Sequence, residues 1–293
     1  MKNKLILSLP KGSMENATIE LFKKAGVTIY PRQDRAYYLS CDDEELKLIL
    51  IRAQEIPKYV ENGVFDCGIT GYDWICETNA KVKEIGELIY SKAGFGPVRW
   101  VVAVPEDSRF QSIKDLRGKR VATELVNVTK KFFKRHNINV KVEFSWGATE
   151  SKPAAGLVDA VVELTETGTS LRANKLRIIA EVLHSTMRFI SNISSYKDKW
   201  KREKMENLYI LLKGAINATS MVGLKMNVEK KNLQKILNIL PALKNPTISP
   251  LSVSNWVAVE VIIEEKIVKT LLPQLKRSGA QGIIEYPLNK LIY

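Results

Sequence analysis

Apolar positions in the first ninety residues form short runs, and most runs are followed by a stretch with helical spacing. Such runs, bounded by Gly, Pro and polar residues, predict buried strands, whereas apolar residues three and four positions apart predict helices. The predicted strands are Leu5–Leu9, Leu46–Arg52, Asp66–Thr70 and Val82–Ile89, and the helices are Ser13–Ala25 and Ile56–Asn62. Strands that alternate with helices predict a mainly parallel sheet, which binds ligands at the carboxyl ends of its strands.

A second unit of the same kind follows Ser91–Pro97, where two glycines and a proline interrupt the periodicity and indicate a hinge. Its predicted elements are the strands Val98–Val104, Arg120–Thr123, Val140–Ser145 and Arg177–Leu183, a strand at Asp159, and a helix over Val126–His136. Ser185–Tyr196 then return the chain toward the first unit. Two crossings predict a two-lobed clamshell with a cleft between its lobes.

The pattern changes once more near Ala218. From there the predicted order is strand, helix, two strands, helix and strand, which is the order of a ferredoxin-like domain. This segment contains no acid, base or nucleophile cluster, so we expect it to sense a ligand or to support assembly. The sequence therefore predicts an α/β protein with a first lobe over residues 1–95 and 185–213, a second lobe over 96–184, and a C-terminal domain over 214–293.

The stretch Asp159–Leu171 is the strongest candidate for chemistry. An apolar strand ends in acids and then in the hydroxyl-rich turn Thr167-Gly168-Thr169-Ser170. The first N–H groups of a helix have no partner within it, so a helix that opens near Leu171 would offer them to a phosphate. Glu163 and Glu166 would accept hydrogen bonds from sugar hydroxyls. The alternative is that Thr167 or Ser170 only caps the helix and Gly168 only forms the turn.

Composition narrows the choice of partner. A net charge of +13 and a pI near 9.5 suit nucleic acid or a small, strongly anionic substrate. The densest basic run, Lys197–Lys204, contains its own acids and is typical of a solvated helix face. No groove-reading or base-stacking motif accompanies it, so we do not expect nucleic-acid binding.

Cysteine and histidine usage adds further bounds. Cys41, Cys67 and Cys76 form no CxxC pair, which favours reduced thiols and a cytoplasmic location. His136 and His184 are too few for a structural zinc site. No stretch is apolar and long enough to predict export or a membrane span.

Several motifs together resemble one enzyme family. They are Leu9-Pro10-Lys11-Gly12, Arg52-Ala53-Gln54-Glu55-Ile56-Pro57, Gly68-Ile69-Thr70-Gly71, Gly147-Ala148-Thr149-Glu150, and Asp159 to Leu171. In this order and spacing the chain resembles ATP phosphoribosyltransferase, the first enzyme of histidine biosynthesis, in its long form. The resemblance implies two α/β lobes like those of a type II periplasmic binding protein, and a C-terminal domain that binds histidine as feedback inhibitor.

The resemblance also implies residue roles. Glu163, Lys11 and Arg52 would be catalytic, with Glu163 at the ribose hydroxyls of phosphoribosyl pyrophosphate (PRPP). Thr247 and Gly282 would contact the effector. The implied substrate-binding residues are Gly12, Gly71, Tyr72, Glu150, Asp159, Thr165, Glu166, Thr167, Gly168, Thr169 and Ser170, of which the last four would hold the 5-phosphate. Many relatives have Arg where this chain has Ser13, so the contacts to ATP near Lys11 stay open.

The implied reaction joins N1 of the ATP adenine to C1 of the ribose and expels pyrophosphate. A neutral ring nitrogen attacks, so no strong base is needed, and catalysis would depend on positioning and charge. Mg²⁺ is the implied cofactor, its protein ligands are not assigned, and a homo-hexamer is the implied assembly. The alternative is a solute-binding clamshell without catalysis, because such binding proteins have the same two-lobed architecture and a fold does not determine a function.

Overall fold

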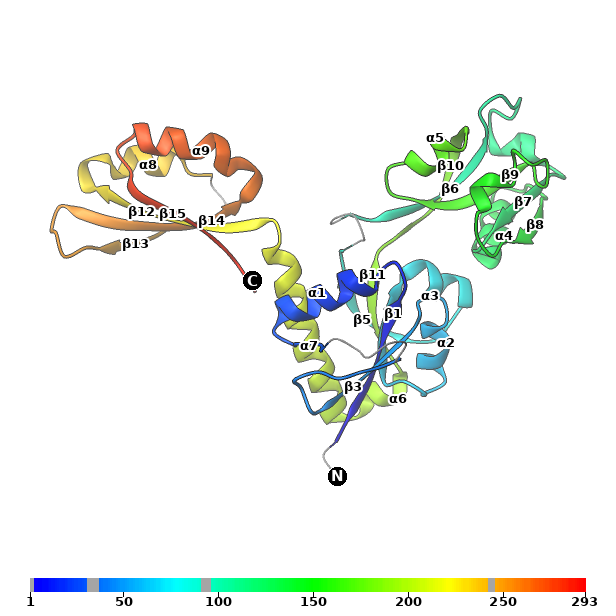
Figure 1. The fold of residues 1–293 in the computed structure, drawn as a ribbon, viewed down its shortest axis with the longest axis horizontal. Coiled ribbons are helices and arrows are strands. Elements are labelled where there is room, and N and C mark those ends of the chain that lie inside the picture. The colour runs from blue at the N-terminus through cyan, green and yellow to red at the C-terminus, as the bar shows by residue number, and fades with distance from the viewer. Residues whose placement is uncertain (1–2, 31–36, 91–95, 242–245) are drawn as a thin grey trace. The chain divides into compact units, whose positions relative to one another are not determined.

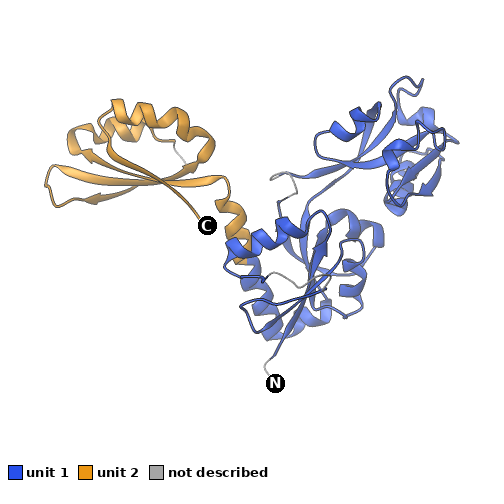
Figure 2. Ribbon diagram, in the orientation of Figure 1, with its two compact units in different colours: residues 1–209 blue, residues 210–293 orange. Residues whose placement is uncertain are grey.

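We describe residues 3–30, 37–90, 96–241 and 246–293 of a computed structural model of the chain. The chain divides into two compact units, residues 1–209 and 210–293 (Figure 2). The first unit contains two lobes, each built on its own sheet (Figure 1).

The first lobe is organised around a six-stranded sheet in the order β2-β3-β1-β4-β11-β5. Its strands are β1 (Leu5–Lys11), β2 (Tyr38–Leu39), β3 (Leu46–Arg52), β4 (Cys67–Gly71), β5 (Lys83–Leu88) and β11 (Met187–Ser191), and its helices are α1 (Glu15–Ala25), α2 (Ile56–Glu61) and α3 (Tyr72–Thr78). Gly68 in β4 must be glycine, because a Cβ there would lie 2.3 Å from Ser8 Oγ. β1, through Ser8, and α2, through Ile56, therefore approach the β4 backbone closely at this point.

The second lobe is organised around a five-stranded sheet in the order β10-β6-β9-β7-β8. Its strands are β6 (Val98–Pro105), β7 (Arg120–Thr123), β8 (Lys141–Phe144), β9 (Ala160–Thr165) and β10 (Leu176–Ser185), and its helices are α4 (Val126–Arg135), α5 (Thr169–Ala173) and the 3₁₀ helices η1 (Ile113–Leu116) and η2 (Thr149–Ser151). The buried face of α4 packs Phe133 into the core of this lobe. His136 ends that helix, exposed, with its ring 4.8 Å from the Phe132 ring.

The prediction of mainly parallel sheets is confirmed for strand direction, because β1, β3, β4 and β5 run the same way in the first lobe, as do β7, β8, β9 and β10 in the second. In the first lobe β1 is parallel to β3 and β4, but β2, β11 and β5 are antiparallel to their neighbours. In the second lobe β7 is parallel to β8 and β9, whereas β6 is antiparallel to β9 and β10. Besides β2, the strands that run against the others are β6 and β11, the first strands after each crossing between the lobes.

The double crossing itself is as expected. β10 pairs with β6 in the second lobe, and β11, which follows at once, pairs with β4 and β5 in the first. The predicted two-lobed core is therefore confirmed. Residues 91–95 of the predicted hinge Ser91–Pro97 lie outside the described residues.

Two helices, α6 (Ile193–Lys197) and α7 (Lys199–Ala218), follow β11. The run Lys197–Lys204 is only partly the solvated face that its charges predict. Lys201 Nζ lies 2.6 Å from the buried Asp66, and Lys204 Nζ lies 2.7 Å from both Asp43 and Glu45. These lysines fasten the first half of α7 to the first lobe.

The C-terminal unit has the predicted βαββαβ order and a sheet in the order β13-β14-β12-β15. Its elements are β12 (Met221–Glu229), η3 (Lys230–Asn232), α8 (Leu233–Ile239), β13 (Thr247–Pro250), β14 (Trp256–Glu264), α9 (Glu265–Arg277) and β15 (Gln281–Pro287). α8 and α9 cover one face of this sheet, and the core lies between them (Figure 1). The α/β class and the ferredoxin-like C-terminal domain are confirmed.

The remaining composition-based expectations concern thiols and membranes. Cys67 is buried, Cys41 and Cys76 are half-buried, and all three are free thiols. Within the described ranges, no helix combines the length and the apolar character that a membrane crossing requires.

Candidate functional site

A cavity of about 400 Å³ lies between the two lobes of the first unit. Its charged lining comes from residues at the carboxyl ends of parallel strands: Lys11 from β1, Arg52 from β3, Asp73 after β4, Glu124 after β7, Glu163 near the end of β9, and Glu166 just after β9. Ligands of open α/β sheets bind at this edge, because loops and helix starts converge there. Two sheets thus contribute to one site.

Lys11 and Arg52 form the cationic side of this cavity. β1 and β3 are parallel and pair these two residues in register, so their side chains start side by side. The Lys11 ammonium also lies 4.0 Å from the centre of the Tyr37 ring, a cation–π contact that positions it. Two neighbouring cations suit a diphosphate or triphosphate.

Glu163 is the central acid on the opposite side. Burial raises the pKa of its carboxyl to about 7, and the negative charges of Glu150 and Glu124 act in the same direction. The Leu164 N–H, at 3.0 Å from Oε1, and the Thr149 hydroxyl donate to it and favour its ionised form. Glu163 is therefore held near the point where it exchanges a proton at neutral pH.

A buried chain of hydroxyls leads to Glu163 from Lys152. Lys152 Nζ donates to Ser145 Oγ at 2.7 Å, and Ser145 Oγ lies 2.8 Å from Thr149 Oγ1. Because an ammonium only donates and a carboxylate only accepts, each hydroxyl must donate toward Glu163 when that residue is ionised. The chain therefore directs positive charge and fixed O–H dipoles at the acid.

The turn Thr167-Gly168-Thr169-Ser170 forms a compact loop in the second lobe. Gly168 has a left-handed φ of +77° and its N–H donates to the buried Thr165 hydroxyl at 2.7 Å. Helix α5 begins at Thr169, two residues earlier than expected, and its first N–H with a partner inside the helix is that of Arg172, which donates to the Gly168 carbonyl. The N–H groups of Ser170 and Leu171 come before this first hydrogen bond of the helix, so they have no acceptor inside the helix. The loop thus has the geometry of an anion cradle.

Two side chains tie this loop to its surroundings. Ser170 Oγ donates to Glu150 Oε1 at 3.3 Å, which places Glu150 beside the loop. Arg172 Nη2 donates to Thr169 Oγ1 at 3.3 Å, and a Cβ at Gly168 would lie 2.9 Å from Arg172 Nη1. Sequence reasoning missed Arg172, although it stands four residues after Gly168 and hence on the same side of the helix.

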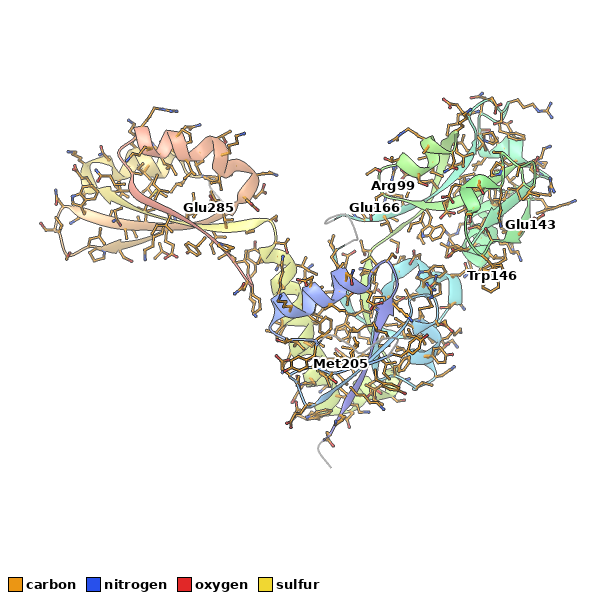
Figure 3. The ribbon with its side chains drawn as sticks, viewed as in Figure 1. Arg99, Glu143, Trp146, Glu166, Met205 and Glu285 are labelled. Atoms are coloured by element: carbon orange, nitrogen blue, oxygen red, sulfur yellow. The ribbon has the colours of Figure 1, made fainter. Side chains whose placement is uncertain are left out.

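Of the sequence-predicted site residues, Lys11, Arg52, Gly71, Glu163 and Glu166 line the cavity. Glu166 follows β9 and is exposed (Figure 3). The residues Glu150, Thr165, Thr167, Gly168, Thr169 and Ser170 do not line the cavity, although Glu150 is near enough to Glu163 to raise its pKa and accepts the Ser170 hydroxyl. Gly12 lies between Lys11 and Ser13, which both line it.

The structure does not bring Asp159 and Tyr72 to the cavity. Asp159 precedes β9 and is therefore at the opposite end of that strand from Glu163; it accepts the Arg120 N–H at 2.9 Å. Tyr72 opens α3 and packs against the first-lobe core under the Arg188 guanidinium, 5.1 Å from its ring centre. In a helix successive side chains point about 100° apart, so Tyr72 turns away where Asp73 turns in.

Asp73 and Glu124 are acids of the cavity that sequence reasoning missed. Asp73 is buried, accepts the Trp100 Nε1–H at 2.7 Å, and burial raises its pKa. Glu124 is half-buried, and burial raises its pKa as well. Asp73 follows the predicted strand Asp66–Thr70 by three residues and Glu124 follows Arg120–Thr123 by one, and that position is the signal by which they could have been found.

A second cavity, of about 440 Å³, lies in the C-terminal unit. Thr247 and Glu260 line it and stand opposite one another on the antiparallel strands β13 and β14. The Tyr286 ring crosses the sheet over Gly223 and donates its hydroxyl to Glu260. Gly282 has a left-handed φ of +53° in β15 and does not line this cavity.

Metal ligands do not gather anywhere in the part of the chain that the structure describes. There, no group of three or more His, Cys, Asp or Glu side chains is arranged to hold an ion.

Comparison with known proteins gives the family. Residues 52–214 match the sequence profile of ATP phosphoribosyltransferase, and residues 218–290 match the profile of the HisG C-terminal domain. ATP phosphoribosyltransferase of Chlorobium chlorochromatii is 59% identical over 292 residues, 99% of each chain, and that of Thermodesulfovibrio yellowstonii is 56% identical over 293 residues, 100% of each.

A solved structure agrees. In the ATP phosphoribosyl transferase (HisG:HisZ) complex from Thermotoga maritima, one chain superposes with a TM-score of 0.61 and 26% identity, over 71% of this chain and 98% of that one. The regions matched by these relatives thus include both lobes that line the interlobe cavity, and also the C-terminal unit. The chain belongs to the ATP phosphoribosyltransferase family.

Proposed function

We propose that this protein transfers the 5-phosphoribosyl group of PRPP to N1 of the ATP adenine and releases pyrophosphate, the first step of histidine biosynthesis. The observation that carries this proposal is the interlobe cavity, in which Lys11 and Arg52 face an acid set centred on Glu163. The reaction is inferred from family membership, and the cavity contains the charged residues that this reaction needs.

The ribose half of PRPP occupies the second lobe in this proposal. The turn 167–170 holds the 5-phosphate through its N–H groups and hydroxyls, and Arg172 adds a cation beside it. Glu163 accepts hydrogen bonds from the ribose hydroxyls. As the bond to pyrophosphate weakens, C1 becomes electron-poor, and the nearby carboxylate stabilises that positive charge.

The pyrophosphate leaves toward the first lobe. Lys11 and Arg52 are adjacent across β1 and β3, so both meet the negative charge that develops on the leaving group. The attacking N1 of adenine is neutral, so no base has to remove a proton before attack. The overall charge of +13 favours encounter with two polyanions.

Mg²⁺ completes the proposal as a partner of the substrates. It prefers octahedral oxygen coordination and is commonly held by substrate phosphates with one or two carboxylates. Half-buried carboxylates near the cavity fit that chemistry, and the described residues contain no preformed cage. When bound, the ion would neutralise phosphate charge.

Histidine is the proposed inhibitor, and the C-terminal cavity is its proposed site. Glu260 offers a carboxylate to the ammonium group of an amino acid, and Thr247 offers a hydroxyl beside it. Gly282 has no proposed contact. The T. maritima relative is a complex, and a homo-hexamer is the assembly we propose for this chain.

A substrate-dependence assay tests the proposed reaction. With ATP, PRPP and Mg²⁺ together, the protein should release pyrophosphate at a rate proportional to its concentration, and omission of either substrate should abolish release. The alternative, a solute-binding clamshell, predicts binding of one or both ligands without any pyrophosphate. That result would contradict the proposal.

A further inference from the structure

Helix α3 contacts both lobes, although it lies between two strands of the first lobe in the sequence. Tyr72 and Ile75 pack in the core of the first lobe. Trp74 and Cys76 pack instead against the core of the second lobe. The helix therefore lies between the two cores, and each core fixes one of its faces.

Two acids of α3 make polar contacts with the second lobe. Residues four positions apart lie on the same face of a helix, so Asp73 and Glu77 point the same way. Asp73, in the first turn, accepts the Trp100 Nε1–H of β6 at 2.7 Å. Glu77, in the last turn, contacts the start of α4. Both ends of α3 are thus attached to the second lobe by a carboxylate.

The Glu77 carboxylate binds two backbone N–H groups of α4. Its Oε1 accepts the Asn127 N–H and its Oε2 accepts the Val128 N–H, both at 2.9 Å. The first N–H groups of a helix have no acceptor inside it, and the preceding residue, Leu125, has no side-chain oxygen to supply one. Glu77 therefore caps a helix of the other lobe, where its negative charge meets the positive end of the helix dipole.

A third hydrogen bond completes this connection. The Asn127 side chain donates from Nδ2 to the Glu77 carbonyl oxygen at 3.1 Å. That carbonyl belongs to the last turn of α3, where carbonyl groups have no N–H partner further along the helix. The end of α3 and the start of α4 thus satisfy each other. We call Glu77, Asn127 and Val128 the α3–α4 latch.

The latch is a connection between the lobes in addition to the two chain crossings. The crossings run from β5 to β6 and from β10 to β11. Two such crossings form a hinge about which lobes can turn. The interlobe cavity takes Asp73 from α3 and Glu124 from just before α4, so the spacing of its two walls depends on the latch.

We propose that Glu77 is a positioning residue that holds the two lobes at the spacing at which one PRPP molecule contacts both. This inference rests on the proposed function, in which the second lobe binds the 5-phosphate and Lys11 and Arg52 of the first lobe bind the pyrophosphate. Two binding sites held at the right distance give the second contact a high effective concentration. Without the latch each contact can still form, but PRPP loses the advantage of making both.

A calorimetric titration in the presence of Mg²⁺ compares ribose 5-phosphate with PRPP in the wild type, Glu77→Gln and the control Glu61→Gln. Glu61 also accepts a backbone N–H, that of Lys81 at 2.8 Å, but within the first lobe. An amide oxygen at position 77 can accept only one of the two α4 N–H groups without an amine facing the other. We expect Glu77→Gln to weaken PRPP binding about 10-fold or more.

The same variant should bind ribose 5-phosphate as the wild type does, because that ligand contacts the second lobe alone. Asn127→Ala, which removes the third hydrogen bond, should weaken PRPP binding to a smaller extent, and Glu61→Gln should match the wild type for both ligands. An unchanged PRPP affinity in Glu77→Gln would overturn the proposal. An equal loss for both ligands would overturn it too, because Glu77 would then only support the fold of the second lobe.

Amide hydrogen exchange, followed by NMR without any ligand, separates the latch from the proposed reaction. First-turn amides of a helix have no acceptor inside it, so protection of the Asn127 and Val128 amides in the wild type would report the latch. Both should exchange faster in Glu77→Gln and stay protected in Glu61→Gln. If the wild type shows this pattern but forms no phosphoribosyl-ATP, the reaction is wrong and the latch stands. If the wild type is active and both amides exchange freely, the reaction stands and the latch is wrong.

Discussion

At the scale of single residues, Glu163 is held between two opposing influences. Burial, Glu150 and Glu124 favour its neutral form, whereas the Leu164 N–H and the hydroxyl of Thr149 favour its carboxylate. The hydroxyl chain from Lys152 reinforces the second influence. The acid therefore titrates near neutral pH, with its pKa at about 7, rather than near the ordinary range of a glutamic acid.

The first prediction concerns Thr149→Val. If the ionised Glu163 is the active form, kcat/KM for PRPP should rise with pH through about 7 in the wild type. Valine removes a hydrogen bond to the carboxylate, so the pKa should rise and the inflection should move to higher pH. The variant should lose more activity at pH 6.5 than at pH 8.5. A pH–rate profile measures this, and a uniform loss at all pH values would show that Thr149 only supports the fold.

Some of the site residues could be predicted from the sequence, and others could not. The paired cations Lys11 and Arg52 and the acid Glu163 lie at strand ends that periodicity locates. Asp73 and Glu124 lie just after such ends too, but neither belongs to a motif of the family resemblance, since the motif on the first of these strands ends at Gly71. Asp159 was misplaced because a strand has two ends, and only the direction of the chain tells which end meets the cavity.

At the scale of elements, the loop before α5 depends on one backbone conformation. Gly168 has φ +77°, which residues with a Cβ adopt at a cost of about 1–2 kcal/mol, and a Cβ there would press on Arg172. The sequence identified this turn from its residue types. It did not predict the start of α5 at Thr169, because that start is set by the Thr165 hydroxyl, which accepts the Gly168 N–H.

The second prediction compares Gly168→Ala with Gly118→Ala. Gly118 also lies in the second lobe with φ +75°, and a Cβ there has no neighbour within 4 Å. Both variants should lower the melting temperature by similar small amounts, but only Gly168→Ala should raise the KM for PRPP, by roughly 10-fold for one displaced charge-assisted contact. Equal KM values in the two variants would contradict the cradle.

The element order was easier to predict than strand direction. Alternating strands and helices gave both lobes and the C-terminal βαββαβ order. The antiparallel pairings of β6, β10 and β11 were not predicted, because they arise from the two crossings between the lobes. The local spacing of apolar residues does not indicate the direction in which a strand enters a sheet.

At the scale of the whole molecule, helix α7 belongs to both units. Lys201 and Lys204 tie its first half to the first lobe, and the Leu291 N–H donates to the Gly214 carbonyl near its end. The division between units, at residue 210, falls inside this helix. Truncation near Lys213 would cut α7 through its last turns, so point substitutions test regulation more cleanly than removal of the C-terminal unit.

The third prediction concerns Glu260→Gln, with Glu285→Gln as control. Glu285 is an exposed acid in β15 that does not line the C-terminal cavity (Figure 3). Loss of the Glu260 charge should weaken inhibition by histidine about 10-fold or more, since a hydrogen bond to a charged group contributes about 1.5–3 kcal/mol. Activity without histidine should stay at the wild-type value. Unaltered inhibition in Glu260→Gln would remove the effector assignment.

The most direct test of the account compares Glu163→Gln with Glu143→Gln in the rate of phosphoribosyl-ATP formation, followed by mass spectrometry. Glu143 is an exposed acid in β8 of the same lobe, outside the interlobe cavity (Figure 3). We predict a loss of roughly 100-fold or more for Glu163→Gln, wild-type rates for Glu143→Gln, and native circular dichroism for both. A Glu163→Gln protein that forms the product at the wild-type rate would contradict the claim that this cavity carries the reaction.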